Sequence, residues 1–245
     1  MIKKFGVLPM AKKKFTSYMT PTEQIAGVVF FVIYLLVLPF ITDPAFRLAE
    51  RLLGTSISEP LENIIYYYIL FAVTIVIFHK YIGHTSKRLA DNLGLAAKTL
   101  VVGLVGLYGL NELVYRLSNL LFTNRTNLND STISAQIQDA PHVTLMIVVL
   151  LAPFVEEVLF RGLVFGNLKF KSRGVAYVVS CALFALLHVW QFAVVNQDVT
   201  YFVVMLQYFV PGFVLAWVYD HSGTLWTSIG LHAAANALAA WTYFL

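Results

Sequence analysis

Three charged residues interrupt an apolar segment in the second half of the chain. Glu156, Glu157 and Arg161 lie between Leu145 and Phe165, where the other residues are hydrophobic or small. Placing a charged group at the centre of a membrane helix costs about 3 kcal/mol or more. This cost indicates that the three groups have a use, and together they are the starting point for an active-site hypothesis.

Later apolar segments carry three further polar residues, His188, His232 and Asn236. A carboxylate in a pocket of low dielectric can act as a base, and an imidazole can orient a water molecule and help to deprotonate it. A second imidazole and an amide can donate hydrogen bonds to a developing oxyanion. The set is sufficient for the attack of water on an amide, and no Ser, Cys or Thr is placed as an obvious nucleophile beside a base.

Helical spacing assigns these groups to faces. Glu157 and Arg161 are four residues apart, which predicts an ion pair within one helix, while Glu156 points about 100° away. Phe184 shares a face with His188, and His232 shares one with Asn236. Pro153 should kink the helix just before the two glutamates.

The similar depths of these polar residues in the membrane indicate that they line one shared cavity. At 1.5 Å per residue, Glu156, His188, His232 and Asn236 lie about 18 to 24 Å from the loop charges nearest to them in sequence. Independent polar substitutions have no reason to reach similar depths on three helices.

Composition indicates a membrane protein. Of the 245 residues, 59% are hydrophobic and 12% are charged, and the mean hydropathy is +0.74, whereas a soluble domain is about 25% charged. We expect an all-α, polytopic transmembrane bundle. The net charge of +4 is explained by loops that orient the chain, so we expect the lipid bilayer and no nucleic acid as a partner. The one cysteine, Cys181, excludes an intrachain disulfide.

Hydropathy predicts about seven spans, at residues 24–42, 61–79, 97–117, 142–166, 174–195, 200–219 and 224–243. We divide the chain into a basic cytoplasmic segment (1–23), an N-terminal transmembrane part (24–141) and a catalytic core (142–245).

Loop charges predict the orientation. With the N-terminus in the cytoplasm, twelve Lys and Arg residues lie inside: Lys3, Lys4, Lys12, Lys13, Lys14, Lys80, Lys87, Arg88, Lys98, Lys169, Lys171 and Arg173. Four lie outside: Arg47, Arg51, Arg116 and Arg125. By the positive-inside rule we expect a cell-membrane protein with a cytoplasmic N-terminus and an external C-terminus.

The motifs Glu156-Glu157-x-x-x-Arg161, Phe184-x-x-x-His188 and His232-x-x-x-Asn236 resemble those of the CPBP family, the CAAX proteases and bacteriocin-processing enzymes, also called Abi proteins. The resemblance covers about residues 142–245. It implies a glutamic-type intramembrane endopeptidase that acts without a metal or other cofactor. Family members usually have eight transmembrane helices, so the resemblance allows for an eighth.

The resemblance also implies a role for each residue. Glu156 matches the general base that activates water, with the help of His188. His232 and Asn236 match the oxyanion-stabilising pair. Three residues match supporting positions: Glu157, Arg161 and Phe184. The implied substrate is a peptide or a membrane-associated protein, and we expect cleavage near the cytoplasmic half of the membrane.

Other functions remain open at this stage. The same fold could serve as a non-catalytic immunity protein that binds a membrane peptide, as in bacteriocin immunity. Glu156, His188 and His232 are also suitable in type as zinc ligands, although no His-Glu-x-x-His motif is present. A transporter could use the buried carboxylates as a proton relay, but the sequence shows no inverted repeat.

Overall fold

The protein is an assembly of helices. The computed structural model describes residues 18–121 and 127–244. Its elements are, in chain order, α1 (Pro21–Val32), η1 (Ile33–Val37), α2 (Leu38–Leu53), α3 (Glu59–Asp91), α4 (Leu93–Leu121), α5 (Leu128–Asp139), α6 (Pro141–Leu145), η2 (Met146–Leu151), α7 (Ala152–Glu157), η3 (Val158–Phe165), α8 (Gly166–Leu168), α9 (Arg173–Leu187), α10 (Trp190–Val195), η4 (Val199–Val204), α11 (Met205–Ser222) and α12 (Leu225–Trp241).

Five helical segments are long and apolar enough to cross a membrane: Pro21–Leu53, Glu59–Asp91, Leu93–Val114, Pro141–Leu168 and Tyr201–Ser222. The chain is therefore a polytopic helical membrane protein, as composition predicted. The other two predicted spans are also helical but shorter. The segment predicted at 174–195 is interrupted, because α9 ends at Leu187 and α10 begins only at Trp190. The last helix, α12, has 17 residues.

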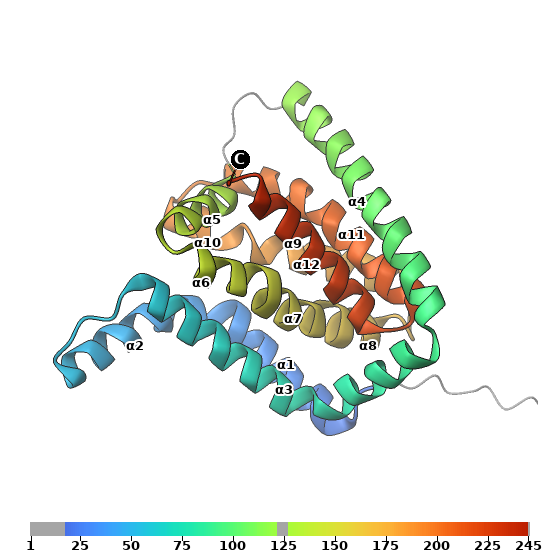
Figure 1. Ribbon diagram of the computed structural model, residues 1–245, viewed down its shortest axis with the longest axis horizontal. Helices are drawn as coiled ribbons and strands as arrows, with labels where there is room; N and C mark the ends of the chain where they lie inside the picture. The colour runs from blue at the N-terminus through green and yellow to red at the C-terminus, as the bar shows by residue number, and fades with distance from the viewer. Residues whose placement is uncertain (1–17, 122–126, 245) are drawn as a thin grey trace, which may run out of the picture.

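The central element is the helix that runs from α6 to α8. It passes between α3 and α12 in Figure 1 and packs against both of them. Of its most apolar window, 61% is buried inside the protein, against 17–33% for the other four long segments. Polar groups on this helix are therefore shielded from lipid by neighbouring helices.

Two irregular segments flank the glutamates on the central helix. Both η2 and η3 are π-helical, and Pro153 lies at the start of the short α-helical turn between them. A proline has no N–H to donate, so it favours such a local change of hydrogen-bond register. The kink predicted at Pro153 thus takes the form of two π-helical segments around α7.

Glu23 is a buried carboxylate outside the predicted motifs, and its role is structural. Its side chain closes a capping box at the start of α1, where Oε2 accepts hydrogen bonds from the Thr20 N–H and hydroxyl, both at 2.8 Å. Its Oε1 accepts the Tyr81 N–H at 2.8 Å, close to the kink of α3 at Phe78. Both carboxylate oxygens are used, and they fasten α1 to α3.

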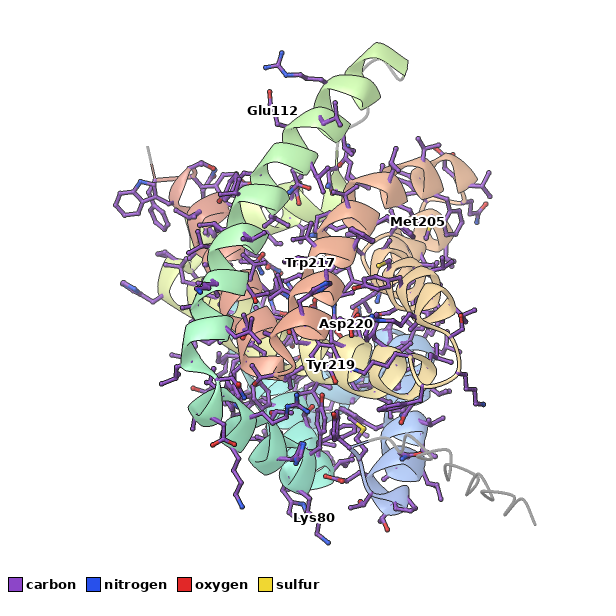
Figure 2. The ribbon with its side chains drawn as sticks, turned by 90° about the vertical axis from the view of Figure 1, so that its right-hand side faces the viewer. Lys80, Glu112, Met205, Trp217, Tyr219 and Asp220 are labelled. Atoms are coloured by element: carbon purple, nitrogen blue, oxygen red, sulfur yellow. The ribbon has the colours of Figure 1, made fainter. Side chains whose placement is uncertain are left out.

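The bundle has two chemically different ends. One end, which we call the basic end, includes α8 and the α3–α4 junction and carries Lys80, Lys87, Arg88, Lys98, Lys169, Lys171 and Arg173. The other end, which we call the opposite end, consists of α2, α5, α10 and the last turn of α12, and these elements gather on the other side of Figure 1. Figure 2, viewed from the basic end, shows Lys80 at the lower edge of the bundle and Glu112 at its upper edge.

Asp220 organises the basic end. This residue lies near the C-terminal end of α11, as Figure 2 shows, and its side chain is only 4% exposed. It accepts hydrogen bonds from Arg173 Nη2 at 2.6 Å and from Tyr177 at 3.3 Å, and Lys169 Nζ lies 3.5 Å away. These bonds hold the α8–α9 loop against α11.

We expect the basic end to face the cytoplasm. In a Cys181→Ala background, Glu112→Cys should react with a membrane-impermeant maleimide on intact cells, because it lies on the exposed surface of the opposite end. Lys80→Cys, the matched control, should react only after permeabilisation. The reverse pattern would show that the chain is inserted the other way round.

Candidate active site

A fully buried ion pair on the central helix holds the site together. Arg161 Nη1 lies 3.0 Å from Glu157 Oε1, and both side chains are 0% exposed. The i,i+4 pair predicted from the sequence is therefore present. The guanidinium has two further contacts, since Nη2 donates to the Gly212 carbonyl at 3.2 Å and the group lies 4.3 Å from the centre of the Phe184 ring. Its buried Nε has no hydrogen-bond partner in the described residues.

Glu157 has a second partner that the sequence did not indicate. The Nδ1 atom of His232, on α12, lies 3.0 Å from the same Glu157 Oε1. A carboxylate paired with a guanidinium accepts hydrogen bonds, so we assign the hydrogen to Nδ1. In a neutral ring Nε2 then carries no hydrogen, and donation from Nε2 to an oxyanion requires protonated His232.

Glu156 lies on the other side of the helix, between two histidines. Its Oε2 is 4.0 Å from His188 Nε2 and 3.9 Å from His232 Nε2. Both distances are too long for direct hydrogen bonds and have the length that a water molecule bridges. This oxygen is buried and has no hydrogen-bond partner within the described part of the chain. The sequence motifs are thus brought together around one carboxylate oxygen.

His188 is held by its own helix end and by two rings. Its Nδ1 lies 2.9 Å from the Phe184 carbonyl, which can only accept, so Nε2 is free to accept a proton. The imidazole stacks on Tyr208 of α11, with ring centres 4.4 Å apart, and contacts the Phe184 ring at 4.7 Å. Tyr208 was not predicted, and no spacing in the sequence relates it to His188.

Asn236 fills a gap in the backbone hydrogen bonding of the central helix. The Ala152 N–H bonds to the Ile147 carbonyl, in the π-helical register. The next carbonyl, that of Val148, would pair in this register with residue 153, which is a proline and has no N–H. The Asn236 amide donates to this carbonyl at 2.7 Å. This bond fixes the amide and leaves its second N–H available.

A cavity of about 600 Å³ contains the four proposed catalytic side chains. Its exposed lining residues, among them Asp43, Asp130, Thr132 and Tyr243, belong to the opposite end of the bundle. The cavity therefore opens away from the basic end. The depth of cleavage, which we expect near the cytoplasmic half of the membrane, stays a prediction.

The pairing of Asn236 with Val148 can be tested without a substrate. Asn236→Ala should lower the free energy of unfolding in detergent by about 1–3 kcal/mol, because a buried carbonyl loses its partner. In the double variant Pro153→Ala/Asn236→Ala, residue 153 regains an N–H for that carbonyl, so the loss should be smaller than the sum of the two single effects. Additive effects in this double-mutant cycle would contradict the arrangement.

Comparisons with known proteins agree with the geometry. Residues 138–238 match the family described as type II CAAX prenyl endopeptidase Rce1-like. A curated relative, UPF0177 protein YxdF of Lactococcus lactis subsp. lactis (strain IL1403), is 30% identical over 90 residues, which are 36% of this chain and 42% of that protein. The chain thus matches about two fifths of its relative's length. No solved structure matches.

The matched region contains every residue of the three motifs, and its helices form the walls around Glu156. The part of the chain that carries the candidate site, residues 138–238, therefore resembles the Rce1-like family of type II CAAX prenyl endopeptidases.

Proposed function

We propose that the protein is an intramembrane endopeptidase that hydrolyses a peptide bond of a membrane-associated peptide or protein. The observation that supports this function is the state of Glu156. Two other buried glutamates, Glu23 and Glu157, have partners that hydrogen-bond or neutralise them. Glu156 and Glu157 each have one buried oxygen without a hydrogen-bond partner in the described residues, but the charge of Glu157 is already paired with Arg161. Glu156 Oε2 is instead directed toward two imidazoles and a cavity, which suits a catalytic base.

The reaction would use a water molecule held between Glu156 and His188. Glu156 takes one proton while the water oxygen attacks the carbonyl carbon of the scissile bond. The negative charge that develops on the carbonyl oxygen is stabilised by the second N–H of Asn236 and by Nε2–H of protonated His232. When the C–N bond breaks, Glu156 returns its proton to the leaving amine. The products are a carboxylate and an amine, and the residues end in their starting states after one further proton leaves to solvent.

The supporting residues would maintain this geometry. Glu157 orients His232 and pairs with it when the imidazole is protonated, in the manner of the carboxylate in a catalytic triad. Arg161 neutralises Glu157. The Phe184 ring contacts the Arg161 guanidinium and both imidazoles, and it separates the guanidinium from them.

A non-catalytic immunity protein on the same fold is the main alternative. Such a protein would bind a peptide in the cavity and would not need Glu156 for that purpose. A zinc-dependent protease is a second alternative. However, among residues 18–121 and 127–244 no three His, Cys, Asp or Glu side chains are grouped so that they could hold a metal ion. This alternative therefore rests on ligand type alone.

Glu156→Gln should lower cleavage by about 100- to 10,000-fold, because the amide cannot accept the proton of the water. The measurement compares purified wild type and variant on a library of membrane peptides, with products identified by mass spectrometry. Glu112→Gln, which removes an exposed carboxylate that does not line the cavity, is the control and should retain activity. A folded, monodisperse Glu156→Gln protein with wild-type activity would contradict the assignment.

Cleavage should survive exhaustive chelation. In the proposed mechanism Glu156 accepts the water proton while His188 holds the water, and His232 with Asn236 stabilises the charge that a zinc ion would otherwise stabilise. The activity of the wild type is measured before and after dialysis against a strong chelator, with elemental analysis of the protein. Activity that is lost and then restored by zinc, with one zinc per chain, would support the metalloprotease instead.

A further inference from the structure

Apart from the two histidines, the ionisable side chains of Asp, Glu, Lys and Arg type that line the cavity are all acidic. Four carboxylates face it, those of Asp43, Glu62, Asp130 and Glu156, and they come from four separate helices, α2, α3, α5 and α7. Among the described residues that line the cavity there is no Lys or Arg. The grouping is therefore a property of the folded cavity and not of one acidic stretch of sequence.

The three outer carboxylates stand between solvent and the proposed catalytic group. Asp43 and Asp130 are exposed at the opposite end of the bundle, and Glu62 is partly buried. Deeper in the same cavity lies the buried Glu156 oxygen without a hydrogen-bond partner in the described structure. A ligand that reaches Glu156 from outside thus passes the other three carboxylates.

Nearby basic groups offset the charge of this entrance only in part, because Arg47 acts on Glu62 but neighbouring carboxylates act on it more strongly. In the regions that the structure describes, Asp43 and Glu62 have no basic side chain within 4.0 Å. Asp130 accepts a hydrogen bond from the neutral Tyr208 hydroxyl at 3.3 Å. Arg47 and Arg51 of α2 belong to the same end of the bundle but do not line the cavity. The entrance therefore keeps a net negative charge.

A cleft lined by charges of one sign, with walls of low dielectric, concentrates ligands of the opposite charge. Its volume of about 600 Å³ is within the range of roughly 300–1,000 Å³ that is usual for ligand sites. Neutral amide and phenol groups from Asn63, Asn129, Gln136 and Tyr208 complete the lining and can hydrogen-bond to a peptide backbone.

We propose that the cavity binds a basic peptide segment, whose Lys or Arg side chains lie against Asp43, Glu62 and Asp130 while a neighbouring peptide bond reaches Glu156. This inference rests on the proposed endopeptidase function and adds the class of substrate. It also gives a direction of entry, from the end of the bundle that lies opposite the basic loops.

The test measures binding without catalysis. The full chain carrying Glu156→Gln is purified in an uncharged detergent, and two fluorescein-labelled peptides are titrated, Lys-Lys-Leu-Ala-Leu-Ala-Leu-Lys-Lys and its counterpart with Glu in place of each Lys. The lysine peptide should bind at least about tenfold more tightly, and its affinity should fall as salt is added.

Variants separate the cavity from the general charge of the surface. Asp43→Asn/Glu62→Gln in the Glu156→Gln background should weaken binding of the lysine peptide by about tenfold. The matched control, Glu112→Gln in the same background, removes an exposed carboxylate of the same end that does not line the cavity, and it should bind as before.

Equal binding of the two peptides, or equal losses in the cavity and control variants, would overturn the proposal of a basic substrate. Neither result would affect the endopeptidase assignment, which is decided by the cleavage assay on wild type and Glu156→Gln. Conversely, binding of the lysine peptide through Asp43 and Glu62 without any cleavage would support the proposed basic ligand and contradict the proposed endopeptidase function.

Discussion

The structure depends on the neutralisation of Arg161. A guanidinium with no exposed surface is tolerated only if its charge is paired. Glu157 supplies the charge, one helical turn earlier on the same helix. The Gly212 carbonyl supplies an acceptor on α11, and Phe184 supplies a ring on α9. Three helices are thereby fixed around one cation, and the positions of the two candidate histidines, His188 and His232, follow from that arrangement.

A second constraint, the need of buried carbonyl groups for hydrogen-bond donors, explains how Asn236 is placed beside the irregular central helix. Inside a membrane protein every backbone carbonyl needs a partner from the protein itself. Pro153 and the π-helical register deprive the Val148 carbonyl of a backbone donor, and Asn236 replaces it from a different helix. A helix with regular hydrogen bonds would have no need of that amide. The irregularity therefore places a polar side chain in the cavity at a position set by the backbone.

Local relations could be predicted from the sequence, and long-range relations could not. The Glu157–Arg161 pair follows from four-residue spacing, and the common depth of Glu156, His188 and His232 follows from helix rise. The contact of His232 with Glu157 joins residues that are 75 positions apart, and no periodicity encodes it.

The N-terminal half illustrates the same limit. Glu23 comes three residues after Thr20, just before an apolar segment, and this spacing is typical of a capping box. Its bond to the Tyr81 N–H, by contrast, lies beside a kink in α3 at Phe78, and no proline at that position predicts the kink from the sequence. The break after Leu187 was missed for a related reason, because hydropathy continues unchanged across it while the helix does not.

The distribution of charge between the two ends connects topology with chemistry. The basic residues that we predict to orient the chain are gathered at the end where Asp220 binds the α8–α9 loop, and the cavity opens at the other end. Because insertion favours Lys and Arg on the cytoplasmic side, few of them remain for the end that carries the opening. The entrance can then be acidic without opposing cations nearby. A membrane protein that is oriented by its basic loops is in this way predisposed to attract basic ligands from the other side.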